Sequence, residues 1–86
     1  MNGYKNPETY HLALWLHNDE YLNNILLHDL LNQAEGNKLV AGELLESCFS
    51  EDADSFIADV KGKDFYWKVR NEVGSLWRVE WQELFN

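Results

Sequence analysis

The segment TYHLALWLHNDEYL, residues 9–22, decides the fold of this chain. It is apolar at both ends and carries an unbroken polar run in between, His17-Asn18-Asp19-Glu20. Asn and Asp are preferred at the N-cap of a helix, and Glu is favourable in the first turn because its charge complements the helix dipole. We therefore interpret the polar run as a joint, at which one helix stops at His17 and Asn18 or Asp19 caps the next.

The residues before the joint predict a helix from Pro7 to about Leu16. Asn6 suits the cap, Pro7 suits the first helical position, and Glu8 falls in the first turn. Apolar residues alternate in this range, which would also suit a strand. The proline at the start and the alanine in the middle favour a helix.

Two further helices are expected after the joint. The first, YLNNILLHDLLNQAEG, ends at Gly36, which suits the left-handed conformation. Its apolar side, at i, i+3, i+4 spacing, consists of Leu22, Ile25, Leu26, Asp29 and Leu30, with Asp29 as the single polar exception. The second, KLVAGELLESCF, is capped by Asn37, and its apolar stripe consists of Leu39, Val40, Leu44 and Leu45, with Cys48 and Phe49 at its end. Gly42 costs about 1 kcal/mol relative to Ala inside a helix, so we expect a close helix contact there.

The remaining residues predict three short helices. The segment SFIADV is preceded by Ser50, Asp52 and Asp54, which suit the cap and the first turn of a helix. This helix is expected to end near Gly62. KDFYWKVRNEV is closed by Gly74, and LWRVEWQELF is capped by Ser75. The fold class predicted for the chain is therefore all-α, a small compact bundle of about five or six short helices in a single domain, residues 1–86.

The composition limits the classes of protein to consider. The chain has 86 residues, four each of Trp, Tyr and Phe, and a formal net charge of −8. The lone Cys48 forms no intrachain disulfide, no apolar run reaches the roughly 20 residues of a membrane span, and the polar N-terminus lacks the apolar region of a signal peptide. We expect a cytoplasmic protein without membrane contact.

The charge is unevenly distributed along the chain. Residues 39–60 contain six acids and no base: Glu43, Glu46, Glu51, Asp52, Asp54 and Asp59. A net negative charge disfavours direct nucleic-acid binding, because phosphate contacts need Lys and Arg. It favours either plain solubility, the default interpretation, or an acidic surface for a basic partner.

No pattern indicates catalysis or a metal site. His11, His17 and His28 are not spaced as ligands on one helix, and Cys48 has no basic neighbour to activate it. A calcium loop starting at Asp52 would need Glu at its twelfth position, where the chain has Lys63. No Gly-rich phosphate loop occurs. We predict a protein that is not an enzyme and that needs no cofactor or metal.

The tryptophans offer two interpretations. Trp77 and Trp81 are spaced i, i+4 and are predicted to share one helix face, with Trp67 nearby in sequence. In so small a domain they are expected mainly in the core. The alternative is an exposed Trp that anchors a partner.

Two stretches resemble a group of small, mostly uncharacterised proteins of phages, plasmids and other mobile elements. The first is TYHLALWLHNDE, which resembles their opening pattern: Thr, Trp or Tyr, any residue, an aliphatic residue, any residue, Leu-Trp, an aliphatic residue, any residue and Asn-Asp-Glu. The second is VEWQEL, residues 79–84, which resembles the short helix that closes them. The resemblance implies expression inside a prokaryotic host and brings no catalytic residues with it.

Three hypotheses follow. The first is a binding module of the anti-CRISPR or anti-restriction type, resembling a DNA mimic, that inhibits or modulates a host protein with a basic nucleic-acid-binding surface. Its expected site is the acidic set of residues 43–59 listed above, with Asp19 and Glu20. The second is a structural, assembly or adaptor protein, such as a small homo-oligomer. The third, ranked last, is binding of single-stranded nucleic acid through KGKDFYWKVR, where cations and aromatic residues alternate.

Overall fold

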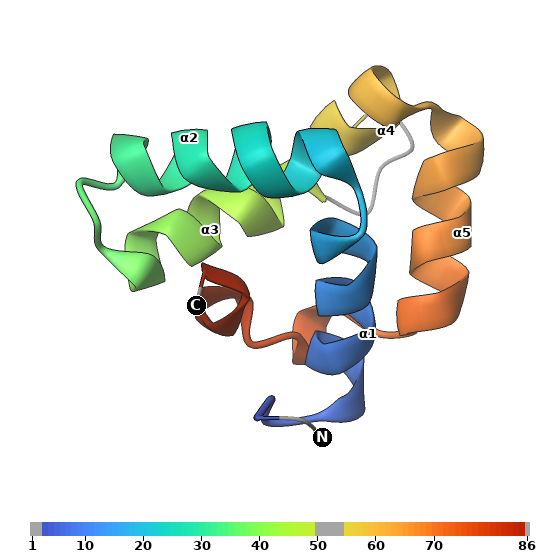
Figure 1. Cartoon of the computed structure of the whole chain (residues 1–86). Helices are drawn as coiled ribbons and strands as arrows, with labels where there is room; N and C mark the ends of the chain where they lie inside the picture. The colour runs from blue at the N-terminus through green and yellow to red at the C-terminus, as the bar shows by residue number, and fades with distance from the viewer. Residues whose placement is uncertain (1–2, 50–54, 86) are drawn as a thin grey trace.

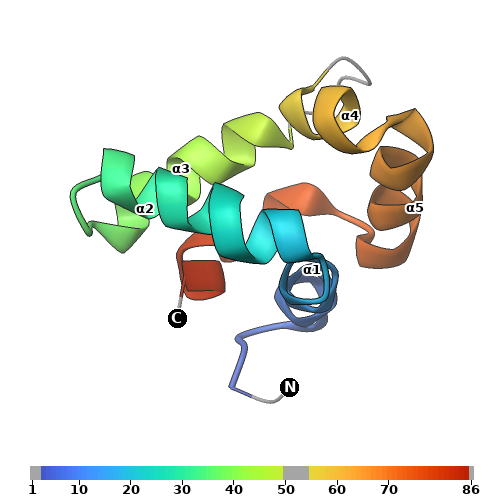
Figure 2. The same ribbon diagram turned by 45° about the horizontal axis from the view of Figure 1, so that its top comes forward.

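The computed structural model describes residues 3–49 and 55–85, and within them the chain forms helices and turns without a strand. Figure 1 shows α2 and α3 side by side on one side of α1, with α5 on the other side, and Figure 2 shows the same arrangement from above. The elements are α1 (Pro7–His17), the π-helical turn η1 (Leu22–Leu26), α2 (Leu27–Gln33), α3 (Lys38–Cys48), α4 (Phe56–Lys61), α5 (Lys63–Val73), and the 3₁₀ turns η2 (Leu76–Arg78) and η3 (Trp81–Phe85). The predicted all-α bundle is confirmed.

The start of α1 and the joint after it form as predicted. The side chain of Asn6 accepts a hydrogen bond from the backbone N–H of Thr9 at 2.9 Å, and the helix ends at His17. Asp19 then accepts one from the backbone N–H of Leu22 at 3.0 Å. The polar run therefore separates two helices, and Asp19 is the residue whose side chain caps the second.

The second helix contains a π-helical turn that the sequence pattern did not reveal. In η1 each hydrogen bond spans five residues, so the turn holds one residue more than an α-helical turn. The buried side consequently includes Leu27, which is buried together with Leu22, Leu26 and Leu30. The prediction for Ile25 was wrong, since its side chain is 51% exposed. The i, i+3 rule assumes 3.6 residues in every turn.

Helix α3 begins at the predicted cap, but it buries a different side. Asn37 accepts hydrogen bonds from the N–H groups at the start of the helix. Leu39 and Val40 were predicted to be in the apolar stripe, yet they are 66% and 41% exposed. The residues of α3 that face the core are Ala41, Gly42 and Leu45.

The reason for this rotation is the close contact of α3 with η3. A Cβ atom on Gly42 would lie 3.0 Å from the backbone nitrogen of Gln82 and 3.1 Å from Cβ of Trp81. The predicted close contact at Gly42 is therefore confirmed. Because glycine allows two backbones to approach, it determines which side of α3 points inward, and Leu39 and Val40 lie away from that side.

The boundaries of α4 and α5 follow local signals. The hydroxyl of Ser55 accepts a hydrogen bond from the N–H of Ala58 at 3.3 Å, so Ser55 is the cap of α4. The predicted cap and first-turn residues, Ser50, Asp52 and Asp54, lie outside the described residues. Gly62 and Gly74 end α4 and α5 with φ values of 96° and 89°, as predicted for both ends.

The C-terminal segment is two short turns and not one helix. Between η2 and η3 the chain is extended at Val79, and the backbone N–H of Glu80 donates a hydrogen bond to the hydroxyl of Thr9 at 2.9 Å. This break separates the two tryptophans that were predicted to share a helix face. Trp77 is 74% exposed, whereas Trp81 is 7% exposed and belongs to the core.

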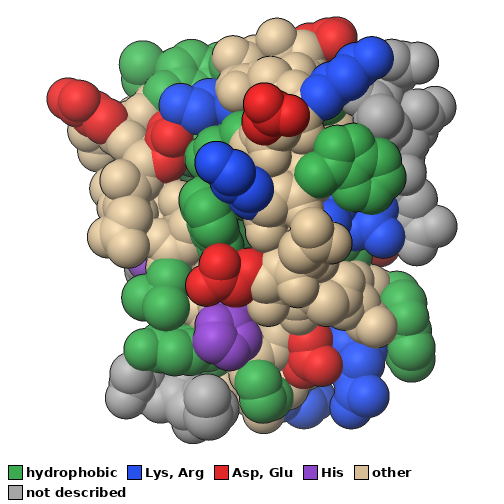
Figure 3. All heavy atoms as spheres, turned by 90° about the vertical axis from the view of Figure 1, so that its right-hand side faces the viewer, with side chains coloured by type: hydrophobic (Ala, Val, Ile, Leu, Met, Phe, Trp, Pro, Cys, Tyr) green, Lys and Arg blue, Asp and Glu red, His purple; other side chains and the backbone are tan. Residues whose placement is uncertain are grey.

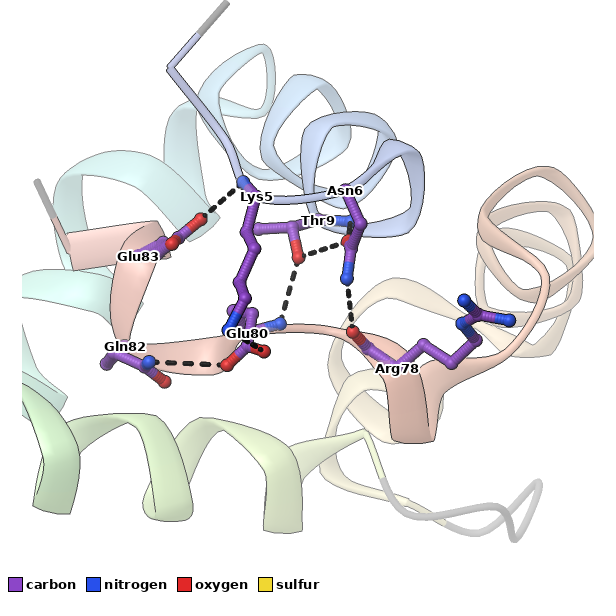
Figure 4. A network of polar contacts seen from close by, with 7 residues as sticks. All are labelled: Lys5, Asn6, Thr9, Arg78, Glu80, Gln82 and Glu83. Atoms are coloured by element: carbon purple, nitrogen blue, oxygen red, sulfur yellow. Dashed lines mark hydrogen bonds and ion pairs between the residues drawn. The ribbon is translucent and has the colours of Figure 1, made fainter. Parts of the chain in front are cut away.

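The N-terminal residues hold this C-terminal segment in place, and we call the network in Figure 4 the terminal clasp, formed by Lys5, Asn6 and Thr9 with Arg78, Glu80 and Glu83. The backbone N–H of Lys5 donates to Glu83 at 2.9 Å, and the Asn6 amide donates to the carbonyl of Arg78 at 2.8 Å. Lys5 also forms an ion pair with Glu80 at 3.5 Å. The clasp keeps η3 against α3, where it covers Gly42.

Candidate partner-binding surface

Two of the predicted acidic residues meet at one groove. Glu43 and Glu46 are both exposed and lie one turn apart on α3. They line a hollow of about 250 Å³ between α3 and η3. The other residues that line it are Leu39, Gly42, Trp81 and Gln82. We call this the α3–η3 groove.

The groove is built on a rigid base. Trp81 packs against Phe49 with ring centroids 5.9 Å apart, and its indole N–H is buried without a hydrogen-bond partner in the described part of the chain. The Gln82 amide is held by the carboxylate of Glu80 at 3.3 Å. The carboxylates of α3 thus lie beside a fixed apolar wall and an exposed leucine, a combination that suits a basic residue next to an apolar one.

The carboxylate of Asp19 makes its contacts within the fold. Its carboxylate lies 2.6 Å from Nζ of Lys61 and also caps the second helix. Burial alone would raise the pKa of Asp19, but the hydrogen bonds from Lys61 and from the backbone N–H of Leu22 outweigh it, so the pKa lies below its ordinary value. Its neighbour Glu20 is exposed. Of this pair, Glu20 presents the more accessible carboxylate.

The remaining predicted site residues are only partly described. Asp59 is exposed on α4, close in sequence to the Lys61 that pairs with Asp19. Glu51, Asp52 and Asp54 lie outside the described residues. The structure therefore brings together Glu43 and Glu46 and leaves Asp59 and Glu20 on other elements.

Ion pairing within the fold leaves a surplus of acids on the α2–α3 hairpin. Three cations are paired with carboxylates: Lys5 with Glu80, Lys61 with Asp19 and Arg78 with Glu8. All of these acids lie outside the hairpin. Within the described residues, no ion pair involves the hairpin acids Asp29, Glu35, Glu43 and Glu46, which are exposed.

The histidines and Cys48 are the residues to examine for a metal site or a reactive thiol. No set of three or more His, Cys, Asp or Glu residues there is arranged to hold a metal ion. His17 and His28, which the sequence separated by the joint, do line one shallow hollow with Asn23. Burial raises the pKa of the Cys48 thiol, so a smaller fraction of this thiol is in the reactive thiolate form.

The residues that carry the mobile-element resemblance have structural roles. Thr9 is fully buried and bonds the C-terminal segment, and Asp19 caps the second helix. Leu12 and Leu16 are fully buried, and Trp81 packs on α3. The two stretches that resemble the group are thus in contact in the fold, through Thr9 and the backbone of Glu80.

Comparison of the chain with protein-family models, with curated proteins and with solved structures finds no match. None of the helices in residues 3–49 and 55–85 has both the length and the apolar character that a membrane span requires.

Proposed function

We propose that this protein is a non-enzymatic binding module that uses the acidic surface of its α2–α3 hairpin to occupy a basic, nucleic-acid-binding surface of a host protein. Its role is then to inhibit or modulate that protein, in the manner of anti-restriction and anti-CRISPR proteins. The observation that carries the proposal is the surplus of unpaired, exposed carboxylates on the hairpin, at Asp29, Glu35, Glu43 and Glu46.

The position of Glu43 and Glu46 gives this surface a centre. Carboxylates one turn apart on a helix are held at a fixed spacing, and complementary charge increases the rate of association with a basic partner. Leu39 beside them is 66% exposed and supplies apolar contact area. A partner surface that carries Lys or Arg around an apolar residue fits this arrangement.

The test is affinity capture from host lysate with a salt gradient. The variant Glu43→Lys with Glu46→Lys reverses the charge at the groove, and Asp64→Lys with Glu72→Lys makes the same change of net charge on α5. We expect the first variant to lose a nucleic-acid-handling protein that the wild type retains until moderate salt, and the second variant to retain it. Equal loss with both variants would show that only net charge matters and would contradict a specific surface.

A second candidate function is assembly through an exposed tryptophan. Trp77 is 74% exposed and lies against the guanidinium of Arg78, whose Cζ is 5.8 Å from the ring centroid. Exposed Trp and Arg are the residue types that concentrate binding energy at interfaces. An adaptor or a small homo-oligomer would use this residue and not the buried Trp81.

A further inference from the structure

The outward surface of α5 holds three cations that form no ion pair among the residues that the structure describes. Lys63, Lys68 and Arg70 take part in no ion pair within the described part of the chain, although Asp64 and Glu72 lie on the same helix. In a chain with 15 acids and seven bases, this helix has three bases against two acids. It is independent of the acidic hairpin, because α5 lies on the other side of α1 (Figure 1).

An exposed aromatic ring lies among these cations. Trp67 is 45% exposed and stands one turn from both Lys63 and Arg70. The guanidinium of Arg70 lies 5.9 Å from the Trp67 ring centroid and donates a hydrogen bond to the hydroxyl of Tyr66 at 3.1 Å. Its Nε is buried without a hydrogen-bond partner in the described residues. The guanidinium is therefore fixed beside the indole, and its charge is not neutralised.

A hollow adjoins this helix on its other edge. It measures about 340 Å³ and is lined by Trp15, Lys68, Asn71 and Glu72. Trp15 is held by an edge-to-face contact with Phe65, with ring centroids 5.4 Å apart. Figure 3 looks onto this side of the molecule, where Lys and Arg side chains lie among hydrophobic ones, with acidic side chains between them.

We propose that this basic-aromatic face, formed by Lys63, Trp67, Lys68 and Arg70 together with Trp15, binds single-stranded nucleic acid. Backbone phosphates pair with the three cations, one base stacks on Trp67, and a base further along the strand enters the hollow beside Trp15. Aromatic platforms within a positively charged track are the usual means of holding a single strand. This function goes beyond the proposed binding of a basic partner and does not depend on it.

The aromatic rings favour a nucleic acid over an acidic polypeptide. The carboxylates of an acidic polypeptide would need only the cations of this face. Every base of a nucleic acid has a π-face that also stacks on the exposed indole. The net charge of −8 led to the expectation of no direct contact with nucleic acid. This charge is a sum over the whole chain, and it does not describe the local charge at one face. Because charges are screened over about 8 Å at physiological salt, the hairpin acids act only weakly at this face.

The experiment measures fluorescence anisotropy of a labelled oligothymidylate as the protein is added at several salt concentrations, from low to physiological. With three phosphates neutralised, the logarithm of the binding constant should fall against the logarithm of salt with a slope of about −2. An abasic oligonucleotide of the same length should bind at least about fivefold more weakly, because it offers charge without bases to stack. Lys63→Glu with Lys68→Glu should abolish binding.

Trp77 provides a matched control for Trp67. Both rings have an arginine against them, at 5.8 Å and 5.9 Å, but Arg78 beside Trp77 is paired with Glu8. We expect Trp67→Ala to weaken binding at least about fivefold and Trp77→Ala to leave it unchanged, with circular dichroism confirming that both variants fold.

Four results would overturn the proposal: no binding at low salt, equal affinity for the abasic strand, equal or tighter binding of polyglutamate, and equal loss with both tryptophan variants. The second and third would assign the face to polyanions or acidic proteins in general. The variant Glu43→Lys with Glu46→Lys should still bind the oligonucleotide, so failure of this inference is distinguishable from failure of the proposed function.

Discussion

Thr9 Oγ1 lies 2.9 Å from the backbone nitrogen of Glu80, so a side chain of the first helix binds a residue 71 positions further along the chain. The same hydroxyl donates a hydrogen bond to Asn6 Oδ1 at 2.7 Å. Thr9 is therefore both acceptor and donor, and it connects the cap of α1 to the break between η2 and η3. The Thr9 side chain itself is fully buried.

Replacing Thr9 with Val should destabilise the protein by about 1–3 kcal/mol, because the N–H of Glu80 would be left buried without an acceptor. Val keeps the shape of Thr, so packing is not the cause. The measurement is urea unfolding followed by far-UV circular dichroism. Thr9→Ser, which keeps the hydroxyl and removes a methyl group, should be less harmful. The reverse order of the two variants would show that packing matters more than the hydrogen bond.

Gly42→Ala should lower the stability even though Ala is the better helix former. The new Cβ would lie about 3 Å from the backbone of Gln82, which cannot move aside as a flexible side chain would. Overpacking costs roughly 1–3 kcal/mol, which exceeds the gain of about 1 kcal/mol in helix propensity. Thermal unfolding measures the difference. Ser47→Ala, at an exposed position of α3, is the control and should leave the melting temperature nearly unchanged or raise it.

The ion pair of Asp19 predicts how stability depends on pH. The pKa of Asp19 is lower in the fold than in the unfolded chain, so the unfolded state binds the proton more tightly. The stabilisation is therefore complete above about pH 4, the ordinary value for an aspartate, and is lost as the pH falls through the lower folded pKa. Unfolding free energies of wild type and Asp19→Asn should differ at pH 6 and converge in strong acid.

Lys61→Met provides the control for this pH dependence. It removes the ion pair and leaves the Asp19 cap of the second helix in place. We expect Lys61→Met to reproduce part of the difference in pH dependence between wild type and Asp19→Asn, since the backbone N–H groups of Leu22 and Tyr21, which also lower the pKa of Asp19, remain. If Lys61→Met showed the full wild-type pH dependence, the cap alone would account for the shift.

Ser55→Ala should destabilise α4 by about 1 kcal/mol, the usual contribution of a serine cap, since it removes the acceptor for the N–H of Ala58. Ser55→Asp keeps an acceptor and should recover most of the loss. Chemical denaturation of the three proteins gives the comparison. An Asp variant as unstable as the Ala variant would indicate that burial of Ser55, and not its capping bond, is what matters.

If the protein assembles through Trp77, its mass should rise with concentration, and Trp77→Ser should remain monomeric while keeping its circular dichroism spectrum. Sedimentation velocity over a wide range of concentration measures this directly. A wild type that stays monomeric at the highest concentration would remove the assembly function.

The parts of the fold that local chemistry determines were predictable from the sequence. The Asn6-Pro7 start, the polar joint with its Asp19 cap, the Asn37 cap and the ends at Gly62 and Gly74 all depend on residues within a few positions of one another. Side-chain hydrogen bonds to nearby N–H groups and the freedom of glycine are properties of short segments, so they can be read without the tertiary structure.

The parts that depend on distant contacts were not predictable. The exposure of Trp77 follows from the break that Thr9 imposes near Glu80, and the rotation of α3 follows from contact between Gly42 and η3. The acidic composition of residues 39–60 could be read from the sequence, but which described carboxylates form ion pairs depends on partners such as Lys61, far from Asp19 in sequence. The position of Trp15 beside α5 likewise depends on a tertiary contact, its packing against Phe65.

The terminal clasp has a mechanical consequence. A force that pulls on the segment before Lys5 would act first on the bonds from Lys5 to Glu83 and from Asn6 to Arg78, before it reached α1. Once they open, η3 can peel away from α3 and expose the backbone at Gly42. Threading of the protein from its N-terminal side, by a translocase or an unfoldase, would therefore begin by breaking these contacts.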